Sequence, residues 1–98
     1  MNTKVELAGF REIDSSSMDI INKDINHHVQ KLAGRCSNLE KLHITLKKIH
    51  EREKGEKYEI KAKLLDNGKA YVSHSTERNI FTAIDLALEK LMHELGIK

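Results

Sequence analysis

Residues 57–95 read KYEIKAKLLDNGKAYVSHSTERNIFTAIDLALEKLMHEL, and this stretch decides the fold. The pair Asn67-Gly68 lies between two alternating runs, which is the strongest short-range signal for a β-hairpin, because a type I′ turn needs positive φ at both positions. A two-residue turn fixes the register of the two strands, so we expect Leu65 to lie opposite Ala70.

This register divides the side chains of the hairpin between two faces of a sheet. The first face is mostly apolar, as expected for a face that packs against a hydrophobic core, and holds Tyr58, Ile60, Ala62, Leu64, Tyr71, Ser73 and Ser75. The second face is basic around a small apolar centre and holds Glu59, Lys61, Lys63, Leu65, Ala70, Val72 and His74. We therefore expect the first face to be buried and the second to be open to solvent.

A helix is predicted directly after the hairpin. Asn79 is its expected N-cap, and Gly96 is expected to end it. Between them, apolar residues recur at three- and four-residue steps and form one stripe for burial. We expect Asp85, Glu89 and Glu94 on the exposed side of this helix.

The first part of the chain predicts a strand and a helix. Residues 4–10 alternate, with Gly9 as a bulge or the strand end. Residues 14–17 offer several N-caps, among which Ser16 has the capping-box spacing to Asp19. Gly34 fits the C′ position that ends this helix.

A further strand is predicted over residues 41–50, where apolar and polar residues alternate again. Lys48-Ile49 interrupts the alternation and predicts a bulge. Residues 51–56 are charged, contain Gly55 and are expected to form a mobile polar connection to the hairpin.

The predicted order is β-α-β-β-β-α, which is an α+β fold in a single domain over residues 1–98. A strand, a helix and a following strand in one sheet call for a right-handed crossover, and the last helix must cover the same face of the sheet. We therefore expect a four-stranded mixed sheet with two helices packed on one face. Lys41, His43 and Lys47 then join the open face.

Size and composition indicate one globular domain without a membrane segment. The 98 residues are 39% hydrophobic and 33% charged. No apolar run reaches the roughly 20 residues that span a bilayer, and residues 1–9 lack the apolar region of a signal peptide, so we expect a cytoplasmic protein.

Positive charge is concentrated in the middle of the chain. Residues 22–63 hold 11 Lys or Arg against 6 Asp or Glu, within a chain of net charge +2. The basic middle is typical of a phosphate-binding surface.

The usual signatures of enzymes and metal sites are missing. The six histidines include no pair at ligand spacing, so we expect no bound metal. No phosphate-binding, dinucleotide-binding or nucleophile-elbow motif occurs, and no catalytic set surrounds the lone Cys36. We expect a protein that is not an enzyme and that has no cofactor and no small-molecule substrate.

Basic residues are the remaining candidates for function. We expect them to form one continuous surface that neutralises phosphates, from Lys23, Lys31 and Arg35 on or just after the first helix to Lys41, Lys47, Lys48, Lys61 and Lys63 on strands. With two Phe and two Tyr, the chain has no row of exposed rings for base stacking. Nucleic acid would therefore be recognised by backbone shape and charge.

Two segments resemble the ribosome hibernation promoting factor family, also called ribosome-associated translation inhibitors. They are ERNIFTAIDLALEKL at residues 77–91 and KLAGRCSNLEKLHITLK at residues 31–47. The most specific element is aromatic-x-A-I-D, formed by Phe81, Ala83, Ile84 and Asp85. That family has the same order of elements, in a shape related to double-stranded RNA-binding domains.

The resemblance implies a non-enzymatic ribosome-binding protein. Its expected partner is the ribosomal RNA of the small subunit, in the channel for messenger and transfer RNA. Binding there inhibits translation and protects idle ribosomes under stress or in stationary phase. Lys31, Lys47 and Lys90 match lysines of the family, and we expect them to contact ribosomal RNA.

Two other functions fit the same residues. One is a small RNA-binding domain for other structured RNA. The other is a protein-interaction module that forms a weak homodimer through the open sheet face, where Leu65, Ala70 and Val72 form an apolar centre ringed by lysine.

Overall fold

The computed structural model describes residues 4–96. The expected single domain covers residues 1–98, and the expected absence of a signal peptide concerns residues 1–9, so both expectations extend to residues outside the described part. The elements are β1 (Lys4–Ala8), α1 (Ser15–Ala33), β2 (Leu39–Glu51), β3 (Gly55–Asp66), β4 (Lys69–Glu77) and α2 (Ile80–Glu94). The predicted order β-α-β-β-β-α and the α+β class are confirmed. Among the described residues, no helix is long and apolar enough to cross a membrane.

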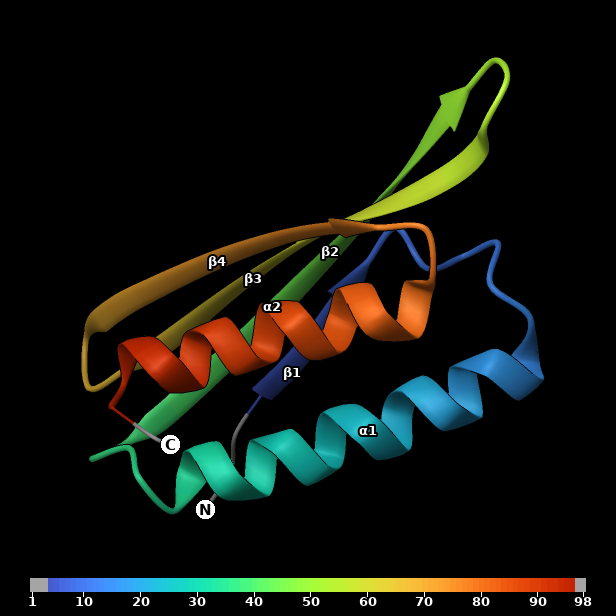
Figure 1. Ribbon diagram of the computed structural model, residues 1–98. Coiled ribbons are helices and arrows are strands. Elements are labelled where there is room, and N and C mark those ends of the chain that lie inside the picture. Colours follow the sequence, from blue (N-terminus) through green and yellow to red (C-terminus); the bar gives the residue numbers. More distant parts are fainter. Residues whose placement is uncertain (1–3, 97–98) are drawn as a thin grey trace.

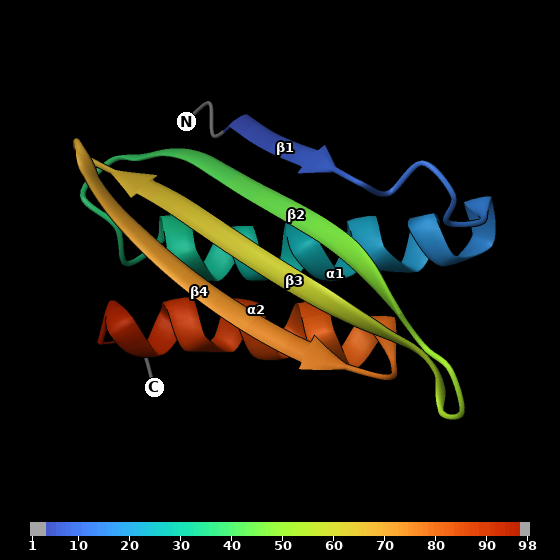
Figure 2. The ribbon, with the colours of Figure 1, turned by 90° about the horizontal axis from the view of Figure 1, so that it is seen from above.

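The four strands form one mixed sheet in the order β1-β2-β3-β4. β1 runs parallel to β2, and the other neighbouring pairs are antiparallel. At the predicted turn Asn67 has φ 49° and Gly68 has φ 82°, and Leu65 pairs with Ala70 as expected. Both helices lie against the same face of the sheet (Figure 1), and the opposite face is uncovered (Figure 2).

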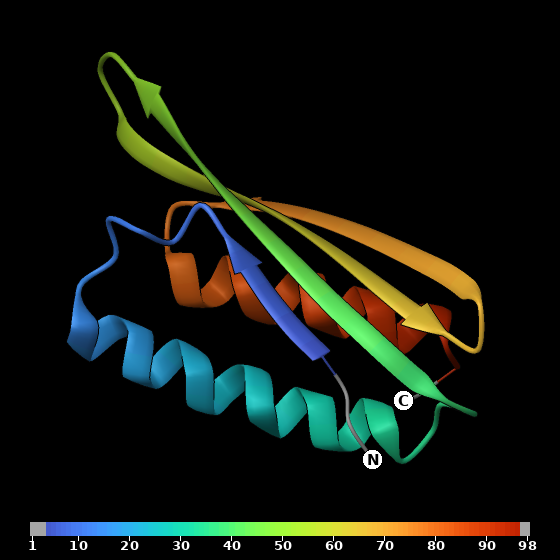
Figure 3. The same cartoon turned by 180° about the vertical axis from the view of Figure 1, so that it is seen from behind.

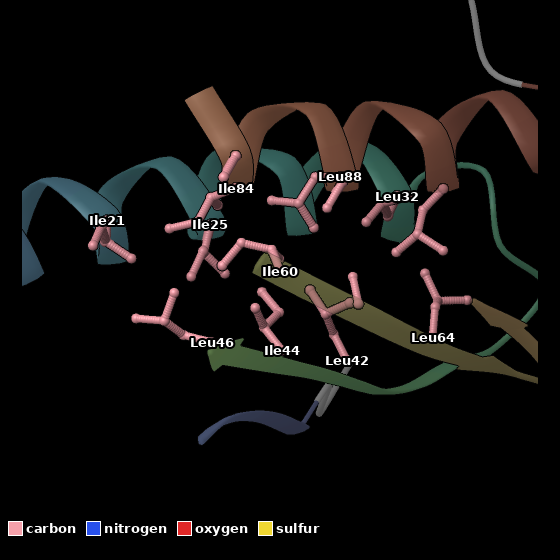
Figure 4. Close-up of a cluster of buried hydrophobic side chains, with 14 of the residues drawn as sticks. Ile21, Ile25, Leu32, Leu42, Ile44, Leu46, Ile60, Leu64, Ile84 and Leu88 are labelled. Carbon is pink, nitrogen blue, oxygen red and sulfur yellow. The ribbon is translucent and has the colours of Figure 1, made fainter. Parts of the chain in front are cut away.

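The core lies between the sheet and the two helices (Figure 4). Its largest side chains are at most 2% exposed, and burying one such aliphatic side chain contributes about 1.5–3 kcal/mol. They come from α1, β2, β3 and α2: Ile21, Ile25, Leu32, Leu39, Leu42, Ile44, Ile60, Leu64, Ile84, Leu88 and Leu91. The apolar faces that the alternation predicts for β2 and β3 are therefore the buried ones.

Two buried serines of β4 attach α2 to the sheet. The hydroxyl of Ser73 donates a hydrogen bond to the backbone carbonyl of Ala87 over 2.6 Å, and Ser75 donates in the same way to Ala83. The two alanines are fully buried, so the helix backbone comes close enough for these short side chains to reach it. These bonds satisfy polar groups that would otherwise be costly to bury.

The helix ends differ in part from the expected ones. Asp14 is the N-cap of α1, because its carboxylate accepts a hydrogen bond from the Ser17 backbone N–H over 3.0 Å, and this bond lowers the pKa of Asp14. The capping box at Ser16 is therefore wrong. Gly34 lies in the right-handed region at φ −69°, so its predicted C′ role is also wrong. For α2, the predicted Asn79 cap is confirmed, and Gly96 follows the helix with φ 80°.

The hairpin of β2 and β3 is longer and more regular than expected. The predicted bulge at Lys48-Ile49 is wrong, since pairing continues through both residues, and the register instead shifts between Leu39 and Lys41. The expected connection over residues 51–56 is the tip of this hairpin, where Glu51 pairs with Gly55. The tip projects beyond the ends of the helices (Figure 3).

Arg78, between β4 and α2, holds the base of this projecting tip. Its Nη2 lies 2.7 Å from Oε1 of Glu51, and its Nη1 donates to the backbone carbonyl of Lys54 over 2.9 Å. The guanidinium bonded to Glu51 lowers the pKa of that carboxyl. Its Nη1 also donates to the backbone carbonyl of Glu56 over 3.4 Å, so one side chain contacts β2, the turn and β3.

Gly9 is required where the chain leaves β1. It has φ 87°, and a Cβ at this position would lie 2.1 Å from the backbone oxygen of Leu46 on the neighbouring strand β2. We predict that Gly9→Ala lowers the free energy of unfolding by about 3 kcal/mol, because a rigid backbone atom blocks the methyl group.

Gly68→Ala is the matched control, because Gly68 also has positive φ, yet a Cβ there meets nothing within 4 Å. Only the left-handed conformation is then strained, at a cost of about 1 kcal/mol. Urea denaturation of both variants measures the difference. Equal losses of stability would show that the close approach of Gly9 to β2 does not matter.

A candidate nucleic-acid interface on the open face of the sheet

The register arranges the open face as rows of side chains across neighbouring strands. One row holds Lys4, Lys41, Leu65 and Ala70, and the next holds Glu6, His43, Lys63 and Val72. Two further rows hold Ala8, Thr45, Lys61 and His74, and then Lys47, Glu59 and Thr76. Five lysines and two glutamates therefore share the face that no helix covers (Figure 2).

Three of these lysines are available to an outside partner. Lys47, Lys61 and Lys63 are exposed, and over residues 4–96 the structure shows no ion pair for any of them. A lysine without an acidic partner binds a phosphate at a lower cost in free energy, because no existing ion pair has to break. These residues form the strongest part of the predicted phosphate-binding set.

Other predicted cations are already engaged. The Nζ of Lys41 lies 2.7 Å from Oε1 of Glu6, and this lysine holds the pKa of the Glu6 carboxyl below its usual range. Lys48 lies on the hairpin near the projecting tip, where its Nζ is 3.2 Å from a carboxylate oxygen of Glu56. Exposed pairs of this kind are worth at most about 1 kcal/mol, so RNA phosphates could replace the carboxylates.

A shallow depression lies within this face. It has a volume of about 400 Å³ and is lined by Lys41, His43, Lys63, Leu65 and Ala70. Val72 in the adjoining row is 38% exposed. The predicted apolar centre within a ring of lysines is therefore present, and its lining includes no Phe, Tyr or Trp ring.

The predicted basic residues do not form one surface. Lys23 and Lys31 are exposed on α1, and Arg35 follows its end. In contrast, Lys41, Lys47, Lys61 and Lys63 project from the opposite face of the sheet. Lys48 pairs with Tyr58, which packs against the core, so it lies on the helix-facing side of β2 and not on the open face. α1 packs beneath the sheet, so the two groups point to different sides of the molecule (Figure 2). Lys90 on α2 reaches the edge of β4, where its Nζ donates to the backbone carbonyl of His74 over 2.7 Å.

The projecting hairpin carries two further cations that the sequence pattern did not indicate. Arg52 and Lys54 are exposed at the tip, and the described residues provide no acidic partner within ion-pair distance for either side chain. The sequence feature that could have indicated them is the charged run at residues 51–57. This run is typical of an ordinary surface loop, and its place at the tip of a long hairpin is evident only once β2 and β3 are known to extend into it. The tip extends the basic surface away from the helices.

Three potential metal ligands meet at the contact of α1 with α2. Asp24, His28 and Asp85 each place one ligand atom within 4.8 Å of those of the other two. Asp85 is half-buried, so the expectation that it lies on the exposed side of α2 is wrong. No search by local spacing finds this group, because Asp85 comes from a helix at the other end of the chain.

Cys36 has no sign of a catalytic role. The side chain is half-buried near Asp66, and burial raises the pKa of the thiol to about 11, with the carboxylate adding to the shift. The thiol is therefore protonated near neutral pH and is a poor nucleophile.

Comparisons with known proteins agree with the fold. Residues 13–96 match the sequence profile of the family described as Sigma 54 modulation protein / S30EA ribosomal protein. The structure resembles a ribosomal subunit interface protein from Coxiella burnetii, with a TM-score of 0.57, 16% identity, and 98% of this chain and 94% of the other covered. It also resembles the N-terminal domain of Thermus thermophilus Protein Y, with a TM-score of 0.61, 18% identity, and coverage of 97% and 96%. At these identities the likeness establishes a shared fold. Among curated protein sequences, none matches the chain.

Asp85 should make the stability of the protein depend on pH. Burial, followed by the neighbouring carboxyl of Asp24, raises the pKa of Asp85 from 3.8 to about 6. The folded protein therefore binds this proton more tightly than the unfolded chain, and stability falls as the pH rises from about 4 to about 6. We predict that Asp85→Asn removes this fall and raises the free energy of unfolding near neutral pH by about 1 kcal/mol, after allowance for partial solvent access.

Urea denaturation over a series of pH values, with EDTA present to exclude cations, measures this effect. Glu89→Gln is the control, because Glu89 is exposed one turn further along α2. If Asp85→Asn and the unmodified protein lose stability equally over this pH range, Asp85 does not retain a proton in the folded state.

Proposed function

Because the chain belongs to the Sigma 54 modulation protein / S30EA ribosomal protein family, we propose that it binds the small ribosomal subunit and inhibits translation there. The family match spans residues 13–96 and is the observation that carries this proposal. It confirms the resemblance to ribosome hibernation promoting factors that residues 31–47 and 77–91 indicate. Members of this family are ribosome-associated proteins and not enzymes, so the proposed action is stoichiometric.

The similar structures support a ribosomal partner. The Coxiella burnetii protein is described as a ribosomal subunit interface protein, and its fold covers nearly the whole of this chain. A ribosomal partner also implies that the protein acts in the cytoplasm. The proposed site is the channel of the small subunit that messenger and transfer RNA occupy, because a protein bound there competes directly with both.

The open face of the sheet is the proposed contact surface for ribosomal RNA. Lys47, Lys61 and Lys63 are exposed cations without ion pairs, and they lie on two adjacent strands. Each lysine that binds a phosphate releases condensed counterions, which favours association at low salt. The face carries few rings and one shallow depression, so it suits the phosphate backbone better than splayed bases.

The shape of the molecule also suits a channel lined by RNA. Its principal extents are 45 × 25 × 21 Å, and the long axis follows the β2–β3 hairpin that projects beyond the helices (Figure 1). Arg52 and Lys54 at the tip would reach phosphates away from those bound by the sheet. Lys31 and Lys90, which the resemblance to the family selects, would contact RNA from the sides of the helices if the channel encloses the protein.

Binding to ribosomes should decrease steeply as salt rises. The logarithm of the association constant falls with the logarithm of salt concentration, with a slope of about −0.7 to −0.9 for each phosphate contacted. Co-sedimentation with isolated small subunits over a salt series measures this slope. A protein that stays in the supernatant at low salt would overturn the proposal. Equal binding to a free RNA duplex, uncompeted by small subunits, would favour a domain for other structured RNA.

Charge reversal should show which surface makes the contact. We predict that Lys61→Glu with Lys63→Glu weakens binding at least about 100-fold and lowers the salt slope by about 2, because two phosphate contacts are lost. Both side chains are exposed, so the far-UV circular dichroism and the melting temperature should stay unchanged.

The comparison pair is Lys23→Glu with Lys31→Glu, which makes the same change in net charge on exposed positions of α1 and tests the contact expected from Lys31. A smaller effect of this pair would identify the open face as the main contact. If the helix pair abolishes binding and the sheet pair does not, the helix layer faces the RNA and the proposed orientation is wrong. A translation assay in an extract with the same variants then tests whether inhibition follows binding.

A further inference from the structure

The contact between α1 and α2 contains a charged group that the protein alone does not satisfy. Asp85 Oδ1 is buried and has no hydrogen-bond partner, and it is the one such side-chain atom among residues 4–96. The ligand atoms of Asp24, His28 and Asp85 lie within 4.8 Å of one another. A buried carboxylate oxygen without a partner is costly, so a proton or a cation is expected beside it.

Within the residues that the structure describes, no lysine or arginine pairs with the two carboxyl groups. In the described part of the chain, the one ion-pair partner of Asp24 is His28, whose Nδ1 lies 3.5 Å from Asp24 Oδ1, and Asp85 has none. Two carboxyl groups side by side repel each other when both are ionised. One positively charged species between the two carboxylates would therefore stabilise both.

The third residue has the chemistry of a metal ligand. His28 is 8% exposed, so its ring is held by the surrounding core. Its Nδ1 lies 2.9 Å from the backbone carbonyl oxygen of Asp24. In the tautomer that donates this hydrogen bond, the lone pair is on Nε2, and a backbone carbonyl of this kind is a common orienting partner for histidines that bind metals.

From these contacts we propose that Asp24, His28 and Asp85 bind a divalent transition-metal cation of the zinc class between α1 and α2. One imidazole nitrogen with two carboxylate oxygens suits zinc, whereas magnesium and calcium prefer oxygen ligands alone. Water would complete the coordination, since the side chain of Asp24 is 31% exposed.

The cluster needs only a small contraction to hold such an ion. Ligands at zinc distances of about 2.0–2.2 Å in a tetrahedron are about 3.3 Å from each other. The widest separation here is within 4.8 Å, so the ligand atoms would have to approach each other by at most about 1.5 Å. The metal would add a link where α1 and α2 already contact each other directly.

This site is independent of the proposed binding to ribosomes. It lies between the helices, on the side of the sheet away from the open face, so a metal there would stabilise the fold and would not contact RNA through the strand lysines. A failure of either proposal therefore leaves the other standing.

The test compares metal-free protein with and without added Zn²⁺ near neutral pH. At a metal concentration 100-fold above its Kd, the melting temperature of the unmodified protein should rise by about 10 °C. Asp85→Asn and Asp24→Asn should each lose most of this rise. Glu89→Gln is the matched control and should keep it, because Glu89 is exposed outside the cluster.

The two aspartate variants retain all six histidines of the chain, so they separate this site from metal bound by histidine elsewhere. Co²⁺ gives a second readout, since visible absorption bands should form in the unmodified protein and be absent in Asp85→Asn. A rise in melting temperature that is equal in all variants, or absent from the unmodified protein, would overturn the proposal. In the second case the cluster is satisfied by a proton alone.

Discussion

The two-residue turn at Asn67-Gly68 sets the register of β3 against β4, and the division of the sheet into two faces depends on that register. Successive side chains of a strand point to opposite faces, so a slip of one residue would exchange Ile60 and Leu64 with Lys61 and Lys63. The buried face would then hold lysines. The burial of the aliphatic set beneath both helices therefore holds the basic face open to solvent.

The position of α2 links this register to the rest of the molecule. Ser73 and Ser75 fall on the buried face because of the turn, and their hydroxyls bind the backbone of α2 at Ala87 and Ala83. The helix is thereby fixed along its own axis as well as pressed against the sheet. With this placement, Asp85 comes to lie beside Asp24 and His28 of α1.

The same architecture separates two kinds of electrostatic environment. On the open face, exposed lysines such as Lys61 and Lys63 lack acidic partners, which suits a partner that brings its own negative charge. Between the helices, two carboxyl groups share one imidazole and lie partly out of water, which raises the pKa of Asp85. The first environment favours a polyanion, and the second favours a proton or a cation.

Local sequence determined the elements, their order and the two faces of the hairpin, because alternation, turn chemistry and helical periodicity act over a few residues. It could not determine which of residues 14–17 caps α1, because several residue types there can do so. It also could not determine the regular pairing at Lys48-Ile49, because pairing with β3 continues there although the alternation of apolar and polar residues is interrupted.

The candidate site was likewise predicted only in part. The strand lysines were predicted from alternation, whereas their separation from Lys23 and Lys31 required the placement of α1. The group of Asp24, His28 and Asp85 is formed by tertiary structure alone, since contacts between helices from opposite ends of the chain have no signature in local spacing.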